Sequence, residues 1–180
     1  MTTMTRLSDL TGDYVLDTAR TRIGFVARHA MATRVPGEFD EFEGSAQLDG
    51  HDPSRSRVEL TIEARSIQTR NRRRDQQLRS KFLDADNYPT ITFTSTGVVQ
   101  VDRTNFKVTG DLTIRGLTRP VTVDFVLTGT EHDRSDHGRI NFHGSVTINR
   151  KDWGVHWSVA GPLVSAKVLL AIDVAVVRRS

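Results

Sequence analysis

Cysteine is absent from this sequence of 180 residues. Its absence excludes disulfide bonds, a thiolate nucleophile and every zinc or iron–sulfur site that needs a cysteine ligand. Secreted domains often carry disulfides, so a chain without cysteine favours a reducing compartment.

Long hydrophobic segments are lacking as well. The longest apolar run, Val168–Ile172, is far shorter than the roughly 20 residues that span a bilayer. The N-terminus, Met1–Thr11, is polar and has no apolar signal-peptide core. No linker or internal repeat divides the chain. We therefore expect a soluble cytoplasmic protein with a tail at 1–11 and a single domain at 12–178.

A strong excess of one charge is also missing. The chain has 25 basic and 22 acidic residues, a net charge of +3, and 21 of the basic residues are arginine. This excess is too small for a general nucleic-acid surface, and no nucleic-acid recognition motif is present. The one basic cluster lies at 70–74. It is either a solvated helix face or a site for phosphate or anionic lipid, because guanidinium groups pair with phosphate oxygens.

Residues branched at Cβ are abundant, and valine, isoleucine and threonine make up 48 of the 180 residues. Such residues favour strands, and apolar residues alternate with polar ones through most of the chain. Short connections indicate antiparallel neighbours, so about eight strands should form a sandwich or a closed barrel. A helix is expected at Thr69–Ser80, across one end. The expected strands are 22–30, 39–48, 58–65, 90–94, 108–115, 121–127, 140–149 and 164–177.

One face of each expected strand is apolar. In a closed barrel these faces would line a tall tube suited to a long hydrocarbon, since each buried methylene is worth about 0.8 kcal/mol. The same residues could equally fill a packed core. The expected lining residues are Phe25, Phe39, Phe93, Leu112, Ile114, Val123, Phe125 and Phe142, with Trp153 and Trp157 near an opening.

His29 is the most conspicuous polar residue in an apolar register. It shares its strand face with Ile23 and Phe25, so its imidazole should point inward. Buried polar groups need partners, and His29 is either a satisfied core histidine or a contact for a ligand. The sequence contains no Gly-rich phosphate loop, nucleophile elbow or H-E-x-x-H motif, which disfavours an enzyme.

A second group of histidines and aspartates lies within 132–143. Its composition could suggest a metal site, but Asp, Ser and Gly are typical of a turn between strands. We therefore expect no metal and no cofactor. The group contains His132, Asp133, Asp136, His137 and His143.

Short motifs occur in a fixed order from Gly12 to Val176. They include Tyr14-Val15-Leu16-Asp17, Gly37-Glu38-Phe39, Tyr88-Pro89-Thr90-Ile91-Thr92-Phe93, Gly110-Asp111-Leu112-Thr113-Ile114-Arg115-Gly116 and Asn149-Arg150-Lys151-Asp152-Trp153-Gly154. By their order and spacing, the chain resembles the YceI-like, polyisoprenoid-binding bacterial proteins. It departs from the usual family pattern at Gln77 in place of histidine, at Lys81 in place of an acidic residue and at Trp153 in place of phenylalanine.

The resemblance implies a lipocalin-like, elongated eight-stranded antiparallel barrel that encloses an isoprenoid chain. Polyprenyl phosphates and isoprenoid quinones are the ligands it suggests, and it also implies a homodimer. We expect non-enzymatic binding, carriage or storage of such a lipid, with transient contact to a membrane surface. Arg74, Asp75 and Arg150 are the candidates for the headgroup end.

The sequence is also compatible with two other functions. One is an enzyme that acts on a lipid or a stress metabolite through His29 or the group at 133–143. The other is a phosphate-binding or membrane-surface interaction module built on residues 70–74.

Overall fold

The computed structural model describes residues 6–29, 33–132, 138–155 and 164–179. Most of them belong to eleven strands: β1 (Gly12–Leu16), β2 (Arg22–His29), β3 (Thr33–Phe39), β4 (Phe42–Leu48), β5 (Arg57–Glu63), β6 (Ile67–Gln68), β7 (Thr90–Gln100), β8 (Asn105–Ile114), β9 (Leu117–His132), β10 (Gly138–Asn149) and β11 (Val164–Arg178). The helical elements are the 3-10 turns η1 (Leu7–Leu10), η3 (Pro53–Arg55), η4 (Ala64–Ser66) and η6 (Arg150–Trp153), the α-helix α1 (Arg72–Gln77) and the π-helix η5 (Leu78–Phe82).

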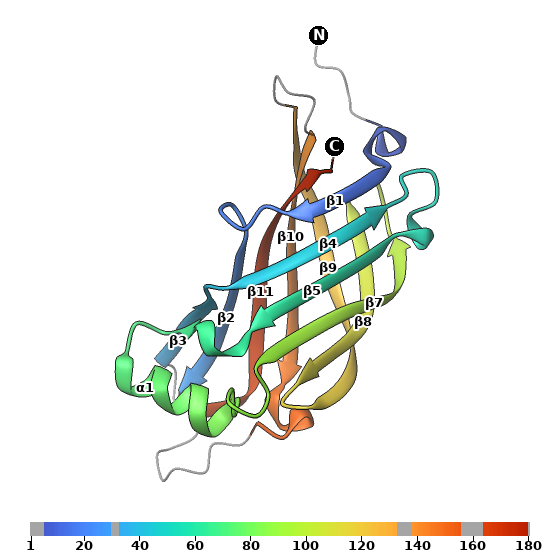
Figure 1. Ribbon diagram of the computed structural model, residues 1–180. Helices are drawn as coiled ribbons and strands as arrows, with labels where there is room; N and C mark the ends of the chain where they lie inside the picture. Colours follow the sequence, from blue (N-terminus) through green and yellow to red (C-terminus); the bar gives the residue numbers. More distant parts are fainter. Residues whose placement is uncertain (1–5, 30–32, 133–137, 156–163, 180) are drawn as a thin grey trace.

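Eight strands form a closed antiparallel barrel (Figure 1). Their order around the barrel is β1, β4, β5, β7, β8, β9, β10 and β11, and pairing of β1 with β11 closes the ring. Closure gives each of these strands a neighbour on both sides, so most of the backbone polar groups find partners within the wall. The predicted all-β fold and the number of strands in the barrel are confirmed.

The other three strands, β2, β3 and β6, extend the wall at the lower end of Figure 1. β1 and β2 pair with successive stretches of one edge of β11, with Leu16 opposite Val176 and Ile23 opposite Ile172. β2 then pairs with β3, and β3 with β6. The wall here is therefore built from short strands in line, of which the sequence predicted β2, at 22–30.

The N-terminal turn η1 closes the upper end of the barrel (Figure 1). Leu7 and Leu10 face the interior, and Leu10 is buried in a cluster with Tyr14. The Tyr14 hydroxyl donates to the Leu10 carbonyl over 2.8 Å and accepts from Arg178 over 2.9 Å. The expectation that residues 1–11 form a tail is therefore wrong for η1, because its leucines gain burial against the barrel.

Helical segments cover the lower end of the barrel (Figure 1). α1 begins after Asn71, whose side-chain oxygen accepts the Arg74 N–H over 3.0 Å and so acts as the N-cap. The helix predicted at Thr69–Ser80 is therefore divided. It starts only at Arg72 and continues as the π-helix η5, which buries Phe82.

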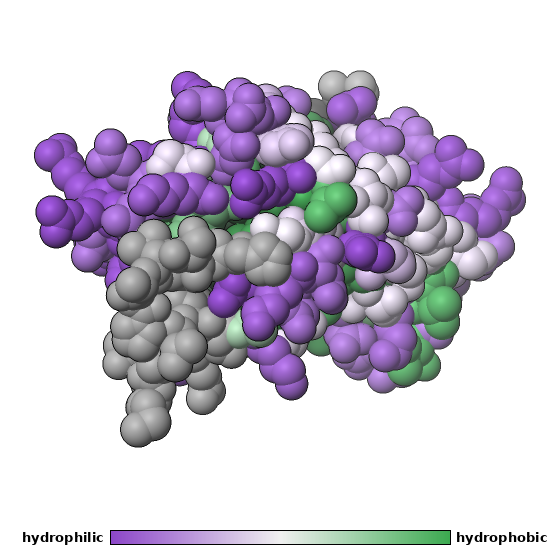
Figure 2. Space-filling model, turned by 90° about the horizontal axis from the view of Figure 1, so that it is seen from below, coloured by the Kyte–Doolittle hydropathy of each residue, from purple (hydrophilic) through white to green (hydrophobic). Residues whose placement is uncertain are grey.

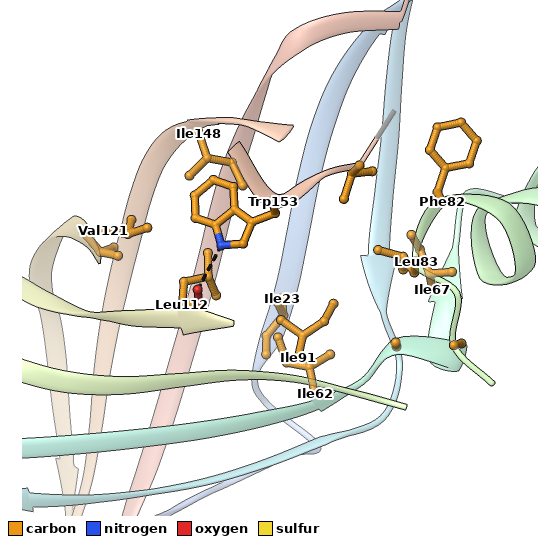
Figure 3. Packing of buried hydrophobic residues seen from close by; sticks show 14 residues of the cluster. Ile23, Ile62, Ile67, Phe82, Leu83, Ile91, Leu112, Val121, Ile148 and Trp153 are labelled. Carbon is orange, nitrogen blue, oxygen red and sulfur yellow. Dashed lines mark hydrogen bonds between the residues drawn. The ribbon is translucent and has the colours of Figure 1, made fainter. Parts of the chain in front are cut away.

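Buried apolar residues form two clusters along the barrel axis, one at each end. The larger one lies at the lower end, where Ile62, Phe82 and Trp153 from separate elements pack toward the same interior (Figure 3). No helix among the described residues is long and apolar enough to cross a membrane.

Candidate functional site

A cavity of about 350 Å³ lies inside the barrel. Its lining reaches from Leu7 and Leu10 at the upper end to Arg74 and Leu78 at the lower end, and it exposes almost no polar atoms. Small-molecule sites typically measure about 300–1,000 Å³. Of the two interiors that the sequence left open, the structure therefore has the apolar tube.

Nine of the predicted lining residues border this cavity. The alternation of each strand explains why: on β9, for example, Val121 and Val123 face inward, while Thr122 and Asp124, which alternate with them, are exposed. Their contact with a ligand stays a prediction. The nine residues are Phe25, Phe39, Phe93, Leu112, Ile114, Val123, Phe125, Phe142 and Trp153.

Glycines on neighbouring strands let aromatic rings lie flat against the wall. The Phe125 ring covers Gly144, where an added Cβ would lie only 2.4 Å from a ring carbon. The Phe93 ring covers Gly110 in the same way, with 2.5 Å to the added Cβ. Real Cβ atoms do not approach so closely, so any larger residue would push these rings toward the tube. The structure shows which ring each of these glycines accommodates.

Trp153 borders the lower end of the cavity from η6 (Figure 3). Its side chain is 3 % exposed, and its indole Nε1–H donates to the Leu112 carbonyl of β8 over 2.9 Å. A buried indole needs such a partner, which the family's more common phenylalanine would not require. Gly154 ends this turn in the left-handed conformation (φ 69°), which glycine adopts without strain.

Two of the three predicted headgroup residues, Arg74 and Arg150, line the cavity at its lower end. Arg74 donates to the hydroxyl and the carbonyl of Thr69 over 2.8 and 2.9 Å. Arg150 donates to the Val155 carbonyl over 2.6 Å. Burial lowers the pKa of the Arg150 guanidinium, yet arginine keeps its charge in proteins. The apolar tube thus has two cationic side chains at one end.

Asp75 is placed differently from the expectation. It is 6 % exposed and does not line the cavity. Its carboxylate accepts the backbone N–H of Thr69 over 2.9 Å and also the Thr69 hydroxyl. Because the same hydroxyl accepts from Arg74, Asp75 holds the Thr69 side chain that orients this guanidinium.

Sequence reasoning missed two arginines that fasten the lower end. Arg115, from the turn between β8 and β9, donates to the carbonyls of Phe82 and Gly154 over 3.2 and 3.4 Å, so it joins η5 to η6. Arg79 donates to the Arg65 and Ile67 carbonyls over 2.7 and 3.2 Å. The only signal in the sequence was the preference for arginine over lysine, which supplies several donors from one planar group.

Most of the histidine candidates lie outside the described residues. The side chain of His29, the last residue of β2, and the whole of Trp157 lie outside the described residues. So do the residues 133–137. His143 pairs with Asp173 over 2.7 Å, but both side chains are exposed on the outer face of the barrel.

A protein-family model described as the YceI-like domain matches residues 14–176. The chain belongs to the YceI-like family. Among the family's sequences, a UPF0312 protein of Pseudomonas paraeruginosa is 34% identical over 152 residues, which cover 84% of this chain and 79% of that protein. A UPF0312 protein of Shewanella denitrificans is 32% identical over 164 residues, covering 89% and 86% of the two chains.

Several solved structures share the barrel fold. The YceI protein of Campylobacter jejuni superposes with a TM-score of 0.77 at 26% identity and covers 85% of this chain and 90% of its own. BcnA of Burkholderia cenocepacia gives 0.79 at 22% identity, covering 89% and 98%. A polyisoprenoid binding domain from Saccharophagus degradans gives 0.71 at 16% identity, covering 92% and 98%. Membership in this family was predicted from the short motifs and is confirmed.

Proposed function

We propose that this protein binds one long isoprenoid lipid inside the barrel and carries or stores it, without a cofactor and without catalysing a reaction. The observation that carries the proposal is the apolar cavity of about 350 Å³ that extends from η1 to α1. The surface of this interior is almost entirely apolar, which suits a hydrocarbon chain better than a sugar, a nucleotide or a peptide. A solved neighbour with the same fold is a polyisoprenoid binding domain, which supports the ligand class.

The tube favours ligands with a long apolar chain. Transfer of each methylene from water into the protein is worth about 0.8 kcal/mol, so affinity should rise with chain length until the tube is filled. The flat rings of Phe93 and Phe125 leave space along the axis for such a chain, because Gly110 and Gly144 let them lie against the wall.

The headgroup of the lipid lies at the lower end in this proposal. Arg74 and Arg150 are the charged residues of the cavity lining at that end. Guanidinium groups bind phosphate oxygens through charge-assisted hydrogen bonds, which are stronger than those to the neutral oxygens of a quinone. We therefore favour a polyprenyl phosphate over an isoprenoid quinone.

The first test is to identify the lipid that copurifies with the protein. Native mass spectrometry before and after solvent extraction should find a bound mass, and the extract should contain an isoprenoid compound. The delipidated protein is then titrated with polyprenyl phosphates of increasing length. An empty protein whose affinity does not depend on chain length would contradict the proposal.

The second test addresses the headgroup with two neighbouring arginines. Arg74→Gln should weaken binding of a polyprenyl phosphate at least tenfold, because a hydrogen bond between charged groups is worth roughly 1.5–3 kcal/mol. It should leave binding of an uncharged quinone within about threefold. Arg72→Gln is the matched control, since Arg72 is exposed and absent from the cavity lining. Equal losses in both variants would remove the headgroup assignment.

Two further predictions concern the compartment and the oligomeric state of the protein. We expect the protein in the cytoplasm and as a homodimer. The alternative of an enzyme gains no support from the described histidine–carboxylate pair, His143 and Asp173, because it lies on the outside of the barrel.

A further inference from the structure

We propose that the lower end of the barrel is a docking surface for membranes that contain anionic lipids. This inference rests on the proposed function only in that a lipid carrier must reach a bilayer. The surface comprises α1, the loop after η5, the turn between β8 and β9, and η6, which all lie at the lower end in Figure 1.

Charge is distributed unevenly along the barrel axis. Residues 64–90 contain seven basic and three acidic residues, residues 114–120 contain two basic residues and no acidic one, and residues 149–155 contain two basic residues and one acidic one. These segments together have an excess of seven positive charges, whereas the whole chain has a net charge of +3. The rest of the chain is therefore net negative by four. Such a polarity turns the lower end toward an anionic surface and the rest of the molecule away from it.

Two large apolar side chains protrude within this basic end. Tyr88 is 39% exposed and Leu117 is 45% exposed. Tyr88 packs on Gly116, where an added Cβ would lie 2.7 Å from its ring, and Leu117 lies against Gly154. Both side chains therefore contact a glycine of this end and remain partly exposed. Seen from below in Figure 2, hydrophilic side chains surround this end, and hydrophobic side chains show between them near the middle.

Three exposed basic side chains at this end have no structural task in the described part of the chain. Arg72, Arg73 and Lys151 are exposed, and none of the three forms an ion pair or a side-chain hydrogen bond with a described residue. Arg79 and Arg115, by contrast, fasten the lower end through backbone carbonyls. Unpaired cations next to exposed apolar side chains are the combination that binds the interface of an anionic bilayer.

The upper end also exposes apolar side chains, Val99 and Val101, beside Arg103, but it belongs to the part of the chain that is net negative. There η1 covers the cavity, and Leu10 is buried beneath it. The cationic residues of the cavity lining, Arg74 and Arg150, lie instead at the lower end. A membrane docked there would meet the end of the cavity that is suited to a charged headgroup.

The test measures flotation of the full chain with two kinds of vesicle, phosphatidylcholine alone and phosphatidylcholine mixed with phosphatidylglycerol. The wild-type protein should bind the mixed vesicles, lose that binding at high salt and not bind neutral vesicles. The triple variant Arg72→Gln, Arg73→Gln, Lys151→Gln should bind about 100-fold more weakly, because each basic residue near an anionic surface contributes about fivefold.

A second triple variant has the same net charge but is changed at the opposite end. Arg55→Gln, Arg57→Gln, Arg103→Gln removes three exposed charges near the upper end and should bind as wild type within about threefold. Equal binding by the two triple variants would overturn the proposal, as would equal binding of the wild type to neutral and anionic vesicles.

The apolar contribution is tested with a second matched pair. Leu117→Ser should weaken binding about tenfold, since roughly half of that side chain is available for insertion. Val101→Ser, which changes a 56% exposed valine far from the lower end, should have no effect. A short RNA duplex serves as a polyanion without an apolar phase. If it binds as tightly as the mixed vesicles and Leu117→Ser changes neither, the surface is a general polyanion patch and the proposal fails.

Circular dichroism and thermal melting establish that each variant is folded. The outcome is also separable from the proposed function. A protein that contains a copurified isoprenoid but ignores anionic vesicles would refute the docking surface alone, whereas an empty protein that binds them would refute the lipid ligand alone.

Discussion

Alanine at position 144 should close part of the tube and destabilise the barrel. In the native structure the Phe125 ring lies over Gly144, and three of its carbons would lie 2.4, 2.7 and 2.9 Å from an alanine Cβ. Ordinary contact begins at about 3.4 Å, so the ring must move by about 1 Å. Part of that movement must go toward the axis, since the backbone of β10 blocks the other direction.

Replacement by alanine should change the free energy of unfolding in opposite directions at Gly144 and at Gly97. Forcing extra volume into a packed interior costs about 1–3 kcal/mol, whereas replacing glycine by alanine in an unobstructed strand gains about 0.5–1 kcal/mol. Gly97 is the matched control because an added Cβ there meets nothing within 4 Å. Gly144→Ala should therefore melt roughly 5 °C or more below Gly97→Ala, at 2–4 °C per kcal/mol for a chain of this size.

Urea titration and calorimetry give the stability of both variants, and the amount of extracted lipid gives the effect on the tube. Gly144→Ala should retain less lipid than Gly97→Ala. The double variant Gly144→Ala, Phe125→Leu should recover part of the stability, because the colliding ring is gone. If Gly144→Ala is as stable as Gly97→Ala and holds as much lipid, the ring does not lie over the glycine in solution and the reasoning is refuted.

Two further predictions concern single hydrogen-bonding groups. Trp153→Phe removes the indole donor to the Leu112 carbonyl and should lower the free energy of unfolding by about 1–3 kcal/mol in urea titrations; an unchanged stability would show that this bond contributes nothing. The pKa of Asp102 is lowered from its ordinary value of 3.8, chiefly because its carboxylate accepts the Thr104 N–H. The ionised carboxylate therefore stabilises the native state at pH values above 3.8, and this stabilisation is lost as the pH falls through the lowered pKa of the folded protein. Asp102→Asn should therefore melt below wild type at neutral pH, and the gap should close as the pH falls below 3.8; a gap independent of pH would contradict this account.

Part of the site could be predicted from the sequence, because successive side chains of a strand point to opposite faces of the barrel wall. Once Val123 and Phe125 were placed on one face, the tube lining followed, and all nine described residues predicted for it border the cavity. Arg74 and Arg150 were predicted at one end from the family motifs, and the structure places both in the lining there.

The packing of η1, within the tail predicted at 1–11, and the hydrogen bonds of Asp75 could not be predicted in the same way. η1 is too short to show a hydrophobic period, and its burial depends on the barrel end that it happens to meet. Asp75 is directed away from the cavity because Thr69, six residues earlier, offers it both a backbone N–H and a hydroxyl. Neither contact follows a local pattern.

The sequence by itself determined that this is an all-β protein whose strands each have one apolar face, since side-chain alternation and the preference of β-branched residues for strands are local properties. Only the tertiary structure decided that the faces enclose a tube rather than a filled core. That outcome depends on which ring lies over which glycine across neighbouring strands, and on which arginine reaches which carbonyl at the lower end. These are contacts between residues distant in the chain, and they exist only once the barrel has closed.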